Sequence, residues 1–172
     1  EFRPRHRRPG QALKPFPLPE VLQKMFDRGK AEMAKPLVGI TTEGSPIAGL
    51  FPLVRTGLSL QGVSDAANAF LASLDVTERA AALFDLETGP WRAWHNMHIF
   101  MTRHGCLLQN LRTEQRERAL DLLCASLSAA GFQTARDVMK LNEHICELTQ
   151  RPEEYGEWYY WISIMGTPSP KE

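Results

Sequence analysis

The chain is poor in cysteine and lacks the spacings that cysteine-based sites require. Its 172 residues include three cysteines, Cys106, Cys124 and Cys146, and no Cys-x-x-Cys pair occurs. An odd number of widely separated cysteines argues against a disulfide framework, and the missing pair argues against a zinc ribbon. We therefore expect reduced thiols that are mostly buried.

The chain also lacks a long apolar run and a net charge. No uninterrupted apolar stretch reaches the ~18 residues that a membrane helix needs. The basic start is not followed by the apolar region of a signal peptide, so we expect no membrane association and a cytoplasmic location. Basic and acidic residues number 20 each, so the overall charge points to no class of partner.

The charge that is present gathers at the start of the chain. Residues 1–30 hold eight basic and three acidic residues. Residues 1–19 contain five prolines, which predict an extended basic arm rather than a helix. The arm has few aromatic residues to stack on bases, so nucleic acid is not an expected partner. We assign residues 20–172 to the N-terminal part of a single α+β domain.

Several helices follow from capping and spacing. Residues 20–34 predict a short helix, and Ser64 is a candidate cap for a helix through 66–74. Asp75 and Glu78 match a capping box for a helix through 78–86. Two further helices are expected after the candidate caps Thr113 and Ser128.

The last of these helices is amphipathic in sequence. Apolar residues recur at steps of three and four, and a polar stripe lies opposite, so we expect the apolar stripe to face the core. The apolar stripe is Phe132, Ala135, Val138, Leu141, Ile145 and Leu148, and the polar stripe is Asp137, Lys140, His144, Glu147 and Arg151.

The strand candidates favour an α+β fold. Residues 36–54 predict two short strands around a turn, and residues 157–166, EWYYWISIMG, predict a strand that is apolar on both faces. Such a strand should be central in its sheet and covered on both sides. We expect helices packed on a mixed or antiparallel sheet, completed by a C-terminal half or a partner chain. An oligomer is the corresponding expectation for the molecule.

Three of the five histidines lie in residues 91–105, WRAWHNMHIFMTRHG. Its aromatic character and its flanking glycines favour a strand over residues 91–104. In a strand His98 and His104 share a side but lie roughly 20 Å apart, too far to bind one ion. We therefore expect each to contribute singly to a site, and we expect Trp91, Trp94 and Ile99 to pack.

The candidate catalytic residues are His98, Arg103 and His104, and His98 is the candidate metal ligand. Imidazole is a common metal ligand and general base, so we expect part of a metal-assisted hydrolase or oxidoreductase, with a divalent metal as candidate cofactor. A second interpretation is a non-catalytic binding module whose aromatic strand and basic arm hold a partner chain.

A third interpretation comes from Arg103-His104-Gly105 followed by Asn110. This run resembles the histidine phosphatase signature, in which the histidine accepts the phosphoryl group and the arginine stabilises its charge. In this chain His144 is the candidate for the second histidine of that family.

The order of motifs resembles the family of domain of unknown function 3500. The blocks are GITTEGSPIAGLFPLVRTG, AANAFLASLDVTERAAALFDL, WRAWHNMH, LRTEQRERALDLLCASLSAAGFQTARDVM and EWYYWISIMGTPS, within about residues 37–170. The resemblance implies an α+β domain without an established activity. It also implies a chain about twice as long, in which Gly-His-His follows, so we expect residues beyond 172 to complete the site.

Overall fold

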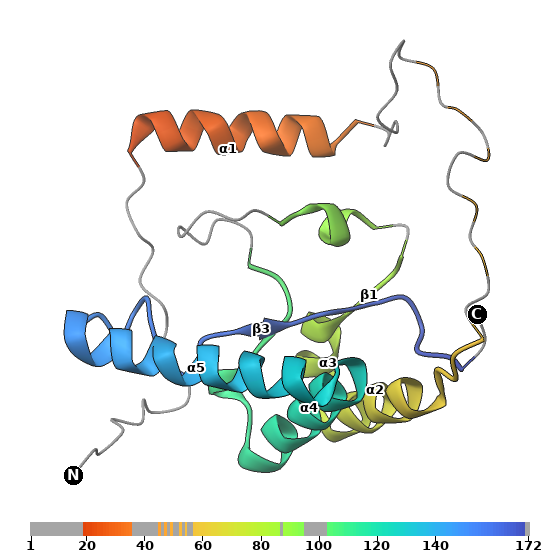
Figure 1. The fold of residues 1–172 in the computed structure, drawn as a ribbon. Helices are drawn as coiled ribbons and strands as arrows, with labels where there is room; N and C mark the ends of the chain where they lie inside the picture. Colours follow the sequence, from red (N-terminus) through yellow and green to blue (C-terminus); the bar gives the residue numbers. More distant parts are fainter. Residues whose placement is uncertain are drawn as a thin grey trace.

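A computed structural model gives the fold (Figure 1). It describes residues 19–35, 57–86, 88–94 and 103–170, with the single positions 45, 47, 49, 52 and 54. The predictions for residues 1–18, for most of 36–54 and for His98 fall outside the described residues.

The described residues form helices and very short strands, which confirms the predicted α+β class. The α-helices are α1 (Glu20–Met33), α2 (Gln61–Ser73), α3 (Val76–Ala82), α4 (Thr113–Ser126) and α5 (Ala129–Thr149). The 3-10 helices are η1 (Gly89–Arg92) and η2 (Leu108–Asn110), and the strands are β1 (Leu83–Phe84), β2 (Cys106–Leu107), β3 (Trp161–Ile162) and β4 (Ile164–Met165). No helix in this part of the chain is long and apolar enough to cross a membrane.

The apolar segment near the C-terminus forms two short strands in two separate two-stranded sheets, so the prediction of one central strand was wrong. β3 pairs antiparallel with β2, and β4, one residue further on, pairs parallel with β1. One sheet is therefore parallel and the other antiparallel, and residues 161–165 pair with two earlier segments of the chain. Figure 1 shows α2, α4 and α5 on one side of this strand and α1 on the other.

The core lies between the strand and the helices on its inner side. Phe70 and Leu71 of α2 are almost fully buried, together with Ala119 of α4 and Met139 of α5. Four alternate residues of the strand region pack against this cluster, namely Trp158, Tyr160, Ile162 and Ile164. Removing apolar side-chain surface from water is favourable, so these partly buried residues help to hold the strand region on the core.

Side-chain caps mark the starts of two of the described helices. The Asp75–Glu78 capping box at α3 and the Ser128 cap at α5 are present as predicted. The prediction for Ser64 was wrong: α2 begins at Gln61, and Ser64 is buried inside the helix. Thr113 is the first residue of α4 rather than its cap. The helix expected to run to residue 86 ends at Ala82, because the next two residues pair with β4 as β1.

Helix α5 is rotated relative to the prediction. Its inner face carries the buried Met139 and two polar side chains that anchor the turn before the strand. Asn142 Nδ2 donates to the Gly156 carbonyl at 2.9 Å, and Glu143 Oε2 accepts from the Glu157 amide at 2.8 Å. These hydrogen bonds orient α5, so the second half of the predicted apolar stripe faces solvent.

Candidate functional site

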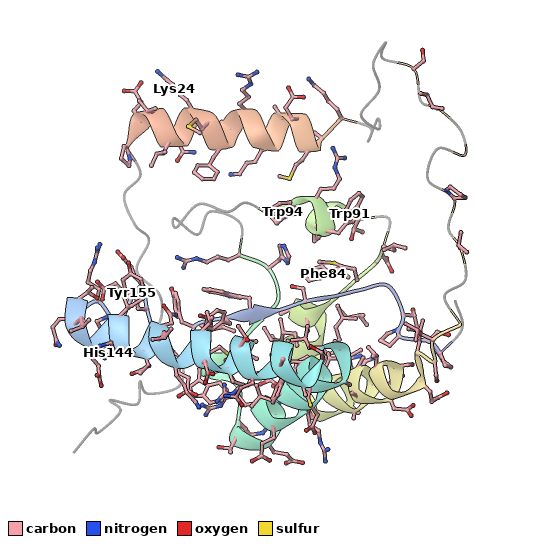
Figure 2. The ribbon with its side chains drawn as sticks, in the orientation of Figure 1. Lys24, Phe84, Trp91, Trp94, His144 and Tyr155 are labelled. Carbon is pink, nitrogen blue, oxygen red and sulfur yellow. The ribbon has the colours of Figure 1, made fainter. Side chains whose placement is uncertain are left out.

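The side of the strand opposite the core carries the candidate site. Successive strand residues point to opposite faces, and paired residues of neighbouring strands share a face. Trp161 pairs with Leu107 and Met165 pairs with Phe84, so these four residues and Ser163 form one face. We call it the outer face. In Figure 2 Phe84 lies on the side of the strand where Trp91 and Trp94 of the η1 region are found.

His104 lies against the outer face and bonds to its serine. His104 Nδ1 and Ser163 Oγ are 2.9 Å apart, although 59 residues separate them in sequence. The imidazole also makes an edge-to-face contact with Phe84, with ring centroids 5.7 Å apart. Hydroxyl and ring together fix the imidazole, and both polar residues remain partly exposed to solvent.

Gly105 makes this approach sterically feasible. Its φ of +98° lies in a region that side chains with a Cβ rarely adopt. A Cβ at this position would stand 2.5 Å from the Ile162 carbonyl oxygen and would also meet the Ser163 hydroxyl. The glycine therefore lets residues 103–105 run close enough to the strand for the hydrogen bond to form.

Arg103 brings positive charge to the same face. Its guanidinium carbon lies 5.7 Å from the centroid of the Trp161 ring, which in turn meets Tyr159 edge to face at 4.9 Å. A cation held over an indole face is attracted by the ring quadrupole. The outer face thus combines an imidazole, a hydroxyl and a guanidinium, a set that suits a polar or anionic ligand.

Two of the three predicted site residues therefore come together, Arg103 and His104, whereas His98 lies outside the described residues. Sequence reasoning missed Ser163. The available signal was its position as the polar member of an apolar alternating face, opposite the Ile162 and Ile164 side.

The predicted strand over residues 91–104 was wrong at both of its described ends. Residues 89–92 form η1, and Arg103 and His104 lie outside any strand. Trp91 and Trp94 are 41% and 76% exposed, so packing is not the role of Trp94. Ile99 lies outside the described residues.

Hydrogen bonds from Arg92 explain why η1 lies near the C-terminal end of α1. It donates to the Lys35 and Glu32 carbonyls at 2.9 and 3.4 Å. These bonds join η1 to the C-terminal end of α1, where carbonyl groups lack helical partners.

Cys106 lies beneath the outer face, on the core side. Its Sγ donates to the Glu78 carbonyl at 2.9 Å. Burial, with the Glu78 and Asp75 carboxylates, raises the pKa of the Cys106 thiol to about 11. The thiol is therefore neutral at pH 7 and suits packing better than nucleophilic chemistry. Of the other two cysteines, Cys124 is exposed and Cys146 is partly buried.

Residues that could hold a metal are few in the described ranges. Between residues 19 and 170, with the gaps given above, no group of three His, Cys, Asp or Glu side chains is arranged to bind an ion. His144 is 58% exposed on α5 and lies 3.9 Å from Glu147, as expected for a solvated residue. The described contacts do not join it to His104.

Comparison with known proteins adds a family. Residues 56–172 match the model of the family described as protein of unknown function (DUF3500). No curated protein and no solved structure matches the chain. Because the matched region covers more than half of the sequence, the chain belongs to the DUF3500 family.

Proposed function

We propose that the protein is a hydrolase in which His104 acts as a general base toward Ser163. The observation that carries this proposal is the 2.9 Å separation between His104 Nδ1 and Ser163 Oγ. A base must lie within about 2.6–3.2 Å of the group whose proton it takes, and this pair meets that requirement. Both residues are partly exposed, so the pair is in contact with solvent.

The role of His104 depends on which imidazole nitrogen carries the proton. When the imidazole carries its proton on Nε2, Nδ1 accepts the hydrogen bond from the Ser163 hydroxyl. Attack of Oγ on an acyl carbon would transfer the hydroxyl proton to Nδ1, and the imidazolium would then protonate the leaving group. In the second step water would attack the acyl carbon and give its proton to His104 Nδ1. The imidazolium would then return a proton to Ser163 Oγ as the acyl group leaves. Arg103, on the same face, is placed to attract an anionic part of the substrate.

A fluorophosphonate probe tests the proposal without knowledge of the substrate. Treatment of the full-length protein should modify Ser163, identified by peptide mass spectrometry. His104→Ala should slow the labelling by about 100-fold or more, the usual contribution of a general base. Ser73→Ala is the matched control, since Ser73 Oγ bonds only locally to the Phe70 carbonyl at 2.7 Å. Absence of label at Ser163, or labelling that His104→Ala leaves unchanged, would contradict the assignment.

A metal-assisted form of the same hydrolase, or an oxidoreductase, is the corresponding proposal for His98. The support for it is the position of His98 six residues before His104 in a segment that reaches the outer face. Metal analysis of the full-length protein, compared with His98→Ala, tests this form. A metal content that is substoichiometric in both proteins would count against it.

The support for histidine-phosphatase chemistry is the Arg103-His104-Gly105 run followed by Asn110. The described partners of His104 are Ser163 and Phe84, and His144 lies on α5 beside Glu147. An aryl phosphate assay, with phosphohistidine detection at His104, separates this activity from the serine hydrolase.

A binding module is the proposal from a different class. Its support is the exposure of Trp94, because an exposed tryptophan is typical of residues that contact partners. We place either function in the cytoplasm, in keeping with an odd number of widely spaced cysteines, which argues against a disulfide framework.

A further inference from the structure

We propose that the substrate is an ester whose acyl part carries a carboxylate and whose leaving group is apolar. This inference rests on the proposed function, because it takes Ser163 as the nucleophile and His104 as its base. The observation that carries it is the placement of Arg103 and His104 on opposite sides of Ser163 along the outer face.

The imidazole of His104 lies toward the β1 end of the outer face. Its ring meets Phe84 edge to face, and Phe84 pairs with Met165, which follows Ser163 by two residues. The antiparallel pairing of β2 with β3 leads to the same position, because moving back from β2 toward residue 104 means moving forward along the partner segment. In Figure 1 β3 and β1 lie at different points along this segment.

The guanidinium of Arg103 lies toward the β3 end. Its carbon is 5.7 Å from the centroid of the Trp161 ring, and Trp161 precedes Ser163 by two residues on the same face. Two strand positions on one face are about 6.6 Å apart at ~3.3 Å per residue. Arg103 is also exposed to solvent. The nucleophile therefore has a cation on its β3 side and the imidazole on its β1 side.

The imidazole determines where the leaving group must lie. As Ser163 Oγ forms a bond to the ester carbonyl carbon, its proton passes to His104 Nδ1. When the bond between that carbon and the alcohol oxygen breaks, the same nitrogen gives the proton to the departing oxygen. The leaving group must therefore lie within reach of His104, beside Phe84 and Met165. These two side chains favour an apolar alcohol, because a charged group placed against them would lose hydration.

The acyl part then extends toward Trp161 and Arg103. Guanidinium N–H groups match both oxygens of a carboxylate, and stacking on an indole limits the positions that the side chain takes. One water molecule hydrolyses the acyl-enzyme, so the products are an alcohol and a dicarboxylic acid. The outer face therefore binds the two parts of the substrate differently, the acyl part by charge and the alcohol by apolar contact.

Two pairs of para-nitrophenyl esters test this assignment on the full chain. In the first pair, the hemiester of glutaric acid is compared with its methyl ester, so the carboxylate is in the acyl part. In the second pair, the pentanoate ester is compared with a form that carries a carboxylate on the nitrophenyl ring. We expect kcat/KM to be about fivefold higher for the hemiester than for its methyl ester, as for one exposed ion pair. The carboxylate on the leaving group should give no increase.

Variants of Arg103 test the source of this preference. Arg103→Gln should remove it, and Arg103→Lys, which keeps the charge, should retain part of it. Arg118→Gln is the matched control and should leave the preference intact, because the Arg118 side chain is 49% exposed on α4 and pairs with Asp121.

Ser163→Ala separates failure of this inference from failure of the proposed function. If this variant hydrolyses the esters as fast as the unchanged protein, the proposed function fails and the substrate assignment fails with it. If Ser163 is required, three results overturn the substrate assignment alone. They are equal kcat/KM values within the first pair, a preference that survives Arg103→Gln, and an equal gain from the carboxylate on the leaving group.

Discussion

At the scale of single residues, the closest steric constraint at the outer face is at Gly105. The backbone there has a positive φ and stands next to the Ile162 carbonyl, so no other residue type fits without a shift of the chain. The hydrogen bond between His104 and Ser163 depends on this approach. A substitution at Gly105 should therefore affect both stability and the site.

Gly105→Ala should lower the free energy of unfolding by about 1–3 kcal/mol, the usual cost of a strained backbone conformation. Gly62→Ala is the control, because nothing lies within 4 Å of the added Cβ and the residue is helical. It should stabilise the protein slightly, by up to ~1 kcal/mol. Urea unfolding of the two variants measures the difference, and equal stabilities would show that the approach at Gly105 is unimportant.

The Cys106 thiol predicts how stability depends on alkaline pH. Its pKa is raised in the fold from an ordinary value of 9.0 to about 11, so the folded state keeps the proton longer than the unfolded state. The stability from the neutral thiol is complete below pH 9 and is lost as the pH rises toward 11. Burial also raises the pKa of Tyr160, which acts in the same direction.

We therefore expect the free energy of unfolding to fall by on the order of 2 kcal/mol between pH 9 and 11. Cys106→Ser, which cannot titrate in this range, should reduce the fall in the free energy of unfolding to the part that Tyr160 causes. Cys124→Ser serves as control because Cys124 is exposed. Thermal unfolding at a series of pH values measures the stability of both variants. An identical dependence of stability on pH in the two serine variants would refute the role of Cys106.

At the scale of elements, one glutamine connects three helices. Gln115 of α4 is 1% exposed, and its Nε2 donates to the Ser73 carbonyl at 2.9 Å and to Glu78 at 2.6 Å. Its Oε1 accepts from the Arg112 amide at 2.8 Å. The side chain therefore provides hydrogen-bond partners at the end of α2, in the capping box of α3 and at the start of α4.

Gln115→Leu should destabilise the protein by about 1–3 kcal/mol, because it leaves a carbonyl and a carboxylate without their buried donor. Gln133→Leu is the matched control: Gln133 bonds to Asp137 on the exposed side of α5 at 2.9 Å. That variant should change stability by less than ~0.5 kcal/mol. Chemical denaturation distinguishes the two, and similar losses for both would remove Gln115 from this role.

Elements with strong local signals could be predicted from the sequence. The capping box at Asp75 and the cap at Ser128 act within one turn, so they could be recognised without tertiary information. The orientation of α5 could not, because Asn142 and Glu143 turn inward for partners 14 residues further along the chain. Likewise, Leu83 and Phe84 continue a helical pattern in sequence, but pairing with β4 makes them a strand.

At the scale of the whole molecule, the candidate site required information from distant segments. Arg103 and His104 could be singled out from the sequence, since they stand in an unusual run of ionisable residues. Ser163 could not be joined to them, because the 59-residue separation is closed only by the pairing of β2 with β3. Membership of the DUF3500 family was also evident from the order of the sequence blocks.

The pairing of β3 and β4 with two earlier segments also bears on how the chain folds. α2, α3 and α4 contact one another within residues 61–126, but neither β1 nor β2 has its partner until residues 161–165 have been synthesised. Contacts between segments so far apart in sequence close large loops and form slowly. The outer face should therefore assemble late in folding, after the helices that support it.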